Sequence, residues 1–333
     1  MIRHSLPDTE TIKRIMTDYD LEEPVQCHVL ARGINDTYAI IDGTEHRYIF
    51  RLYRHGWRNW QGISFELDAL NHLYEQGVRL SYPIKKRNGQ HLSEIEAPEG
   101  LRYGVLFSYS AGERPSITVA NSEMIGATLG RLHLKTSGFM SNYKRGFELD
   151  TDHLLDEPAA VISPVVDKYL GHQAVSILHT VVENTKADLA VLDLEKGFCH
   201  GDFYNHNMHI EDGKMEVFDF DNCAIGYRAY DIAVSWWNLL NNYRSVEREC
   251  WDAFLKGYLT ERNLQADDVR SLPLFITARR IRLLGTMLVN DDVWGTNWIN
   301  ERTLKLFIGQ LRTDRLGDED LREMDEDWLS SRS

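Results

Sequence analysis

The chain has 333 residues, of which 43% are hydrophobic and 26% charged, a composition typical of a globular protein rather than a disordered one. Its net charge of −14 argues against general nucleic-acid binding, which needs a basic surface. The four cysteines form no C-x-x-C pair and no run of about 18 apolar residues occurs, so we expect no zinc site, no disulfide framework, no membrane segment and a cytoplasmic location.

The first third of the chain predicts a small β-rich lobe. Apolar residues at helical spacing predict helices over residues 7–20 and 57–77. Between and after them lie short β-branched and aromatic runs, separated by turn-forming residues. The expected strands are residues 25–31, 36–42, 46–54, 82–89 and 101–109. The first three of these indicate an antiparallel meander.

From residue 119 onward helical periods dominate. The expected helices are residues 122–138, 164–190, 229–244 and 274–290. Two short strands interrupt them at 207–213 and 214–220, and the acidic stretch 315–333 predicts a peripheral helix and tail. Strands followed by helices predict an α+β protein of two lobes, an N-terminal nucleotide-binding lobe over 1–107 and a C-terminal helical lobe over 108–333.

Residues 198–233 carry several carboxylates in apolar, strand-like surroundings. Asp202 and Asn207 are five residues apart, which in a loop lets both side chains face one cavity. Asp219 ends an apolar run, where a carboxylate is costly unless a cation or hydrogen bonds compensate it. A carboxylate can take a proton from a hydroxyl, and Mg²⁺ prefers oxygen ligands that it shares with phosphates. We therefore interpret Asp202 as a base and Asn207 with Asp219 as a metal site.

The motif H-G-D-x-x-x-x-N in "HGDFYNHN", followed by "VFDFDNCAIGYRAYDIA", resembles the aminoglycoside phosphotransferase and choline kinase family. That family has a protein-kinase-like fold and includes type II homoserine kinases and a bacterial stress-response kinase. The resemblance implies a bilobal α+β kinase fold. It also implies that Asp202 is the catalytic base and that Asn207 and Asp219 bind Mg²⁺.

For three other residues of this stretch, Asp231, Asp221 and His206, the sequence allows two possible roles each. Asp231 either caps the following helix or orients the catalytic loop, and His200 is expected to be structural. Asp221 could assist a metal or face the substrate. His206 stands just before Asn207, where the family often has Gly, and it could touch substrate or phosphate or simply fill space.

The upstream lobe holds the phosphate-handling cation that the resemblance requires. Arg51 lies in the third expected strand, where the family usually has Lys, and a guanidinium can hold phosphate with two donors. Glu66, fifteen residues on in the expected helix, matches the acid that orients this cation. The alternative is an exposed Arg and a solvated Glu.

Two further segments match the family's nucleotide-binding parts. In "ARGINDTYAI", Gly33 permits close approach to phosphate, and Asn35 and Thr37 could hydrogen-bond it. In "VLFSYSAGERP", the expected hinge, main-chain groups near Phe107 and Tyr109 would meet the adenine.

The acceptor pocket is expected in the helical part that follows Asp231. Trp236 and Trp237 could bind an amine by cation–π contact, or they could be core residues. In "ARRIRLL" one arginine could bind an acceptor carboxylate, or all could pair with surface acids. These arginines are Arg279, Arg280 and Arg282.

Together these features predict an ATP- and Mg²⁺-dependent kinase that phosphorylates a hydroxyl of a small molecule, such as an aminoglycoside, choline or homoserine. No long activation segment separates Asp221 from Asp231, which favours a small acceptor. The alternatives are a Ser/Thr protein kinase of the stress-response type and a nucleotide-binding scaffold without chemistry. An unrelated metal hydrolase is disfavoured, because no i, i+4 His pair lies on a recognisable helix.

Overall fold

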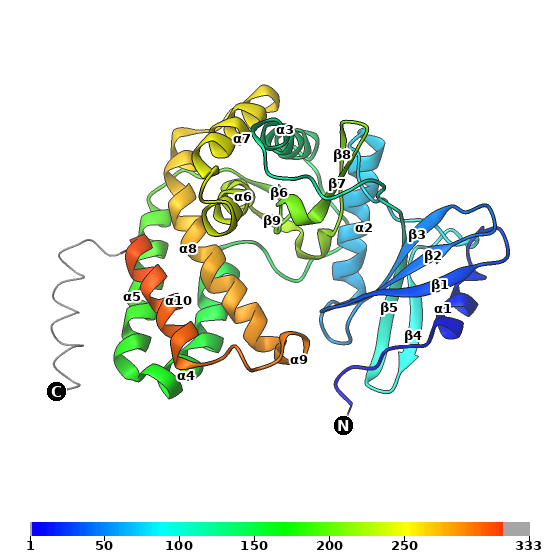
Figure 1. Cartoon of the computed structure of the whole chain (residues 1–333), viewed down its shortest axis with the longest axis horizontal. Helices are drawn as coiled ribbons and strands as arrows, with labels where there is room; N and C mark the ends of the chain where they lie inside the picture. Colours follow the sequence, from blue (N-terminus) through cyan, green and yellow to red (C-terminus); the bar gives the residue numbers. More distant parts are fainter. Residues whose placement is uncertain (1, 316–333) are drawn as a thin grey trace. The chain divides into compact units, whose positions relative to one another are not determined.

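The computed structural model describes residues 2–315, with side chains through residue 313 (Figure 1). The chain divides into two compact units. One unit contains the chain up to Gly146 together with Tyr204–Ala224 and Glu249–Arg262, and the other contains Phe147–Phe203, Ile225–Arg248 and the described part from Asn263 onward. The predicted lobe boundary after residue 107 stays a prediction.

A five-stranded antiparallel sheet organises the first unit, with strand order β1-β2-β3-β5-β4 (Figure 1). The strands are β1 Gln26–Arg32, β2 Asp36–Ile41, β3 Arg47–Leu52, β4 Ser93–Ala97 and β5 Gly100–Ser108. The predicted meander and the strand at 101–109 are therefore confirmed.

The strand predicted over residues 82–89 was wrong. This segment runs beside β5, where the Ser108 N–H donates to the Tyr82 carbonyl and the Ile84 N–H donates to the Leu106 carbonyl. Pro83 between them makes a single isolated bridge, since proline has no N–H to extend a ladder. The extra strand is β4, which begins at Ser93.

The two faces of the sheet have different partners. Helix α1, Thr9–Met16, packs on one face, where Ile12 and Met16 join a core that includes Phe50 and Leu52 of β3. Side chains alternate along a strand, so Arg51 lies on the opposite face. Helix α2, Trp60–Glu75, supplies the acid that meets it there, and the alternation therefore positions the site.

Two helices and a hairpin complete this unit. Strands β7, Met208–Glu211, and β8, Lys214–Val217, form the predicted hairpin. Helix α3, Val119–Lys135, was predicted, whereas α7, Glu247–Glu261, was not. The buried side chains of α7 recur at helical spacing, so the signal was present in the sequence.

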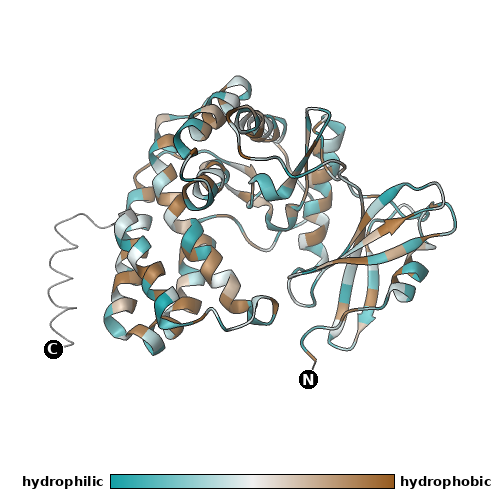
Figure 2. Cartoon of the chain, viewed as in Figure 1, coloured by the Kyte–Doolittle hydropathy of each residue, from teal (hydrophilic) through white to brown (hydrophobic). Residues whose placement is uncertain are grey.

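The second unit is mainly helical. Its helices are α4 Glu157–Leu170, α5 His172–Ala190, α6 Arg228–Asn242, α8 Ala266–Val289, α9 Asp291–Trp294 and α10 Glu301–Arg315. Helix α8 contacts α4, α5, α6 and α10. Hydrophobic and hydrophilic residues alternate along these helices, as expected when one face of each lies in a core (Figure 2). A short sheet of β6, Lys196–Cys199, and β9, Ala224–Tyr227, was not predicted.

The single helix predicted over 164–190 was wrong, because two helices occupy this part of the chain. Gly171, with φ of 82°, ends α4, and α5 begins at the next residue. Pro164 lies inside α4 rather than at its start. The acidic stretch predicted as a peripheral helix and tail lies outside the described residues, apart from Arg315 in α10.

Among the residues that the structure describes, no helix combines the length and the apolar character that crossing a membrane requires.

Candidate active site

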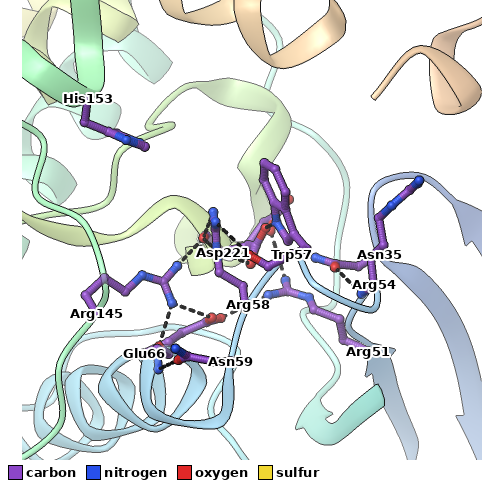
Figure 3. Close-up of polar contacts among 12 residues, drawn as sticks. Asn35, Arg51, Arg54, Trp57, Arg58, Asn59, Glu66, Arg145, His153 and Asp221 are labelled. Carbon is purple, nitrogen blue, oxygen red and sulfur yellow. Dashed lines mark hydrogen bonds and ion pairs between the residues drawn. The ribbon is translucent and has the colours of Figure 1, made fainter. Parts of the chain in front are cut away.

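Arg51 and Glu66 form an ion pair in the first unit. Arg51 Nη1 lies 3.0 Å from Glu66 Oε1, joining the C-terminal end of β3 to helix α2 (Figure 3). Glu66 is fully buried, and its burial raises the pKa of this carboxyl, while Arg51 and Arg145 act to lower it. Arg51 of β3 and Glu66 of α2 therefore form the pair of cation and acid that the family resemblance implies.

Arg51 also contacts Asp219, which follows β8. Its second terminal nitrogen, Nη2, lies 3.0 Å from Asp219 Oδ1. Burial alone would lower the pKa of Arg51, but attraction to Asp219 and Glu66 outweighs it and raises that pKa. Separate nitrogens of one guanidinium therefore hold two acids, an arrangement that the single nitrogen of a Lys side chain reproduces poorly.

Asp221 lies in a buried polar cluster that the sequence did not reveal (Figure 3). Its Oδ2 accepts from Trp57 Nε1 at 2.7 Å, and its Oδ1 lies 3.4 Å from Arg58 Nε. Its backbone carbonyl accepts from Arg58 and from Arg145. Burial acts to raise the pKa of Asp221, but Arg58, Arg145 and Arg51 together hold it below its usual range. These contacts favour a structural role for Asp221 over the two alternatives given above.

Arg145 joins this cluster to helix α2, and we expect the substitution Arg145→Met to destabilise the protein strongly. Arg145 Nη1 donates to the Gly62 carbonyl at 2.6 Å and lies 3.7 Å from Glu66 Oε2. Removing one partner from a buried ionic cluster costs about 3–5 kcal/mol of unfolding free energy. Urea denaturation would measure this loss.

The matched control is Arg131→Met, which removes an exposed guanidinium that lies 2.5 Å from Glu261. Exposed ion pairs contribute about 0–1 kcal/mol, so this variant is expected to unfold close to the wild-type midpoint. Equal losses in the two variants would contradict a stabilising role for the buried cluster.

Asn207 and Asp219 are brought together by the β7–β8 hairpin. The Phe218 N–H donates to the Asn207 carbonyl at 3.0 Å. Asp219 is the next residue, so its backbone lies close to that of Asn207. Asp219 has a left-handed backbone with φ of 63°, which is uncommon outside glycine but which aspartate tolerates better than most residues. An amide oxygen and a half-exposed carboxylate are the donors that a hard divalent cation prefers, so these residues fit a magnesium ion.

A cavity of about 480 Å³ lies within the first unit. This volume is in the range of small-molecule sites. Of the residues predicted for the site, seven line it: Thr37, Arg51, Glu66, Phe107, Tyr109, His206 and Asp219. Apolar side chains that were not predicted also line it: Leu30, Ile49, Leu70 and Phe218. The cavity thus combines an apolar wall with one cationic and two acidic groups.

Gly33 and Asn35 are not among the residues that line this cavity. The Asn35 side-chain oxygen accepts from the Arg54 N–H at 3.1 Å and ties the β1–β2 turn to the end of β3 (Figure 3). A Cβ atom on Gly33 would meet only the Asn35 carbonyl, at 3.7 Å, so no close contact within the protein requires glycine at this position. His206 stacks on Tyr204 and lies 3.2 Å from Arg114 Nη1.

The second unit contains the first part of the H-G-D motif. The Asp231 carboxylate accepts from the backbone N–H groups of His200, at 2.6 Å, and Gly201, at 2.7 Å. Asp231 lies within the first turn of α6, whose N-cap is Tyr227, so it orients the loop and does not cap the helix. Gly201 has φ of 80°, a conformation that glycine adopts without strain.

Asp202, the predicted base, has an ion-pair partner in the same unit. Arg279 Nη2 of helix α8 lies 2.5 Å from Asp202 Oδ1. The Arg279 guanidinium lies over the Trp237 ring, 5.2 Å from its centroid. The cation that contacts the Trp237 ring is therefore the Arg279 side chain, whereas the sequence had suggested the amine of an acceptor. Trp236 Nε1 donates to Glu247 Oε1 at 2.6 Å.

Proteins of known sequence resemble most of this chain. A protein of Deinococcus radiodurans described as uncharacterized is 34% identical over 283 residues, which is 84% of this chain and 81% of the relative. A homoserine kinase of Brucella anthropi is 25% identical over 297 residues, covering 86% of this chain and 83% of that enzyme.

Solved structures share the fold. An amicoumacin kinase in complex with AMP-PNP and Ca²⁺ has a TM-score of 0.77 at 19% identity, covering 92% of this chain and 94% of that one. A microcompartment-associated aminopropanol kinase has a TM-score of 0.75 at 23% identity, covering 92% and 95%. The predicted kinase-like α+β fold is confirmed. The sequence pattern of the phosphotransferase enzyme family matches residues 28–271, and the chain belongs to this family.

Proposed function

We propose that the protein is an ATP- and Mg²⁺-dependent phosphotransferase that acts on a hydroxyl of a small molecule. The observation that carries this proposal is the position of Arg51, which holds Glu66 and Asp219 at the wall of one cavity. Arg51 is oriented by Glu66 and lies beside Asp219, the proposed metal ligand. This arrangement suits a nucleoside triphosphate. ATP as donor is also in keeping with the expected cytoplasmic location.

In this proposal each residue has one task. Arg51 contacts the nucleotide phosphates, and the apolar wall with Phe107 and Tyr109 receives the adenine. Mg²⁺ held by Asn207 and Asp219 would neutralise phosphate charge. Asp202 orients the acceptor hydroxyl and takes its proton as the oxygen bonds to the γ-phosphorus and the bond to ADP breaks. Catalysis then consists mainly of positioning and charge neutralisation.

The test is nucleotide turnover with Mg²⁺ against a panel of acceptors. The panel contains aminoglycosides, choline, ethanolamine, homoserine and a generic protein substrate. We expect ADP release that depends on one class of small acceptor and stops when EDTA removes the metal. Product analysis should place the phosphate on the hydroxyl oxygen of that acceptor.

Other outcomes would decide against the proposal. Phosphate found only on Ser or Thr of the protein substrate would support the stress-response kinase alternative. Nucleotide binding without turnover on any acceptor, with or without Mg²⁺, would support the scaffold alternative. Turnover that EDTA leaves unchanged would contradict the role given to Asn207 and Asp219.

A further inference from the structure

The contact between Asp202 and Arg279 bears on what the acceptor is. We infer that the acceptor is a short hydroxy acid, amino acids included, whose carboxylate binds Arg279 while its hydroxyl meets Asp202. This inference rests on the proposed function. The inference rests on the burial of Arg279, on its contact with Trp237 and on a second buried cation of helix α8, Arg282.

Arg279 is a buried guanidinium held against the predicted base. It is 5% exposed, in the middle of the long helix α8, and it lies 2.5 Å from Asp202 Oδ1. A guanidinium carries five N–H donors in a planar fork, so one such group can hold two carboxylates at once. An acceptor carboxylate on Arg279 would therefore bring the rest of the acceptor next to Asp202.

Trp237 limits how a ligand can approach Arg279. The guanidinium carbon lies over the Trp237 ring, 5.2 Å from the ring centroid. The ring occupies one side of the guanidinium, so an incoming ligand is expected at its edge, where the N–H donors point. A planar carboxylate fits that edge, whereas the ammonium of an amine acceptor would meet a like charge.

A second buried cation lies one helical turn further along α8. Arg282 is 7% exposed, and its Nη2 lies 3.2 Å from His153 Nε2. Arginine can only donate, so His153 accepts at Nε2 and carries its proton on Nδ1, which lies 2.8 Å from Glu157 Oε2. Residues three apart on a helix are neighbours, so α8 presents two guanidiniums close together, of which Arg279 contacts Asp202. This charge favours an anionic acceptor.

The same geometry sets the size of the acceptor. One guanidinium would touch both Asp202 and the acceptor carboxylate, so the hydroxyl and the carboxylate must be separated by only a few bonds. Small 3- and 4-hydroxy acids meet this requirement, whereas acceptors without a carboxylate near the hydroxyl, such as choline, do not.

The experiment compares acids with their carboxamides, which have the same shape and no charge. The probes are 3-hydroxypropanoate, 4-hydroxybutanoate and homoserine, each paired with its amide. Charge-assisted bonds to a buried guanidinium predict that the wild-type protein prefers the acid about tenfold to a hundredfold in kcat/KM. In Arg279→Met the preference is expected to fall to about threefold or less, and Arg279→Lys is expected to restore part of it.

Arg270→Met is the matched control, because Arg270 lies on the same helix, is exposed and lies 3.0 Å from Asp267. It should keep the wild-type preference for acids. The ratio between acid and amide within one variant does not depend on how much of that variant folds. Calorimetric titration of the wild-type protein and both Arg279 variants with the same probes measures the preference without turnover.

An equal response to acids and amides in the wild-type protein would overturn the inference, as would a preference that survives in Arg279→Met. Turnover of amine acceptors alone would overturn it while leaving the kinase proposal intact. If no acceptor of any class is phosphorylated, the proposed function fails. In that case a preference for acid binding that Arg279→Met abolishes would still support the carboxylate site.

Discussion

The substitution Asp202→Asn is expected to lower the rate of phosphate transfer by about 10²–10⁴-fold, the contribution of a positioned general base. The amide keeps the shape of the side chain but cannot take the proton of the acceptor hydroxyl. The apolar wall and the cation of the nucleotide cavity are unchanged in this variant, so nucleotide affinity is expected to stay within about twofold. Initial rates and nucleotide titration would measure both quantities.

Asp202→Asn also removes the negative charge that faces Arg279, so loss of stability must be separated from loss of chemistry. A hydrogen bond to a buried charge contributes about 1.5–3 kcal/mol, part of which the amide oxygen retains. Adding Arg279→Met to Asp202→Asn should recover stability without recovering turnover. Asp212→Asn, the same change in an exposed turn where Asn tolerates the φ of 49°, is the matched control. Turnover near the wild-type rate in Asp202→Asn would rule out the role proposed for this residue.

The parts of the fold that the sequence predicted are those with local signals. The meander over 25–54 was predicted because alternating side chains and turn residues lie within a few positions of each other. Arg51 and Glu66 were paired by their places on a strand and the next helix, and the structure joins them at 3.0 Å. Their roles toward a nucleotide belong to the proposed function.

The contacts that could not be predicted join residues far apart in the chain. Arg145 contacts the backbone of Asp221 across 76 residues, and Arg279 reaches Asp202 across 77. No periodicity links such positions, because packing of whole elements decides which buried cation meets which acid. Trp57 is different, since it lies just before α2 in a segment rich in aromatic and cationic residues that could have been noticed.

The second large effect is expected for Asp219→Asn. Asp219 gives a carboxylate to the proposed metal site and faces Arg51 at 3.0 Å. Loss of this charge weakens electrostatic stabilisation of the transferred group, and turnover is expected to fall about 10²–10³-fold. The remaining amide oxygen is a weaker ligand, so the Mg²⁺ concentration for half-maximal rate is expected to rise about 10–100-fold. Rates measured across a Mg²⁺ titration would test both expectations.

Asp221→Asn is the sharpest comparison, because the same change is made two residues away. Asp219 is 45% exposed, so its substitution should cost little stability, whereas Asp221 is buried against Trp57 and Arg58. We expect Asp221→Asn to lower the unfolding midpoint without shifting the Mg²⁺ requirement. A shift in that requirement would instead assign Asp221 to the metal, the alternative that its carboxylate contacts disfavour. An unchanged Mg²⁺ requirement in Asp219→Asn would exclude Asp219 as a ligand, and Arg51 would then have to be interpreted as a structural partner of both acids.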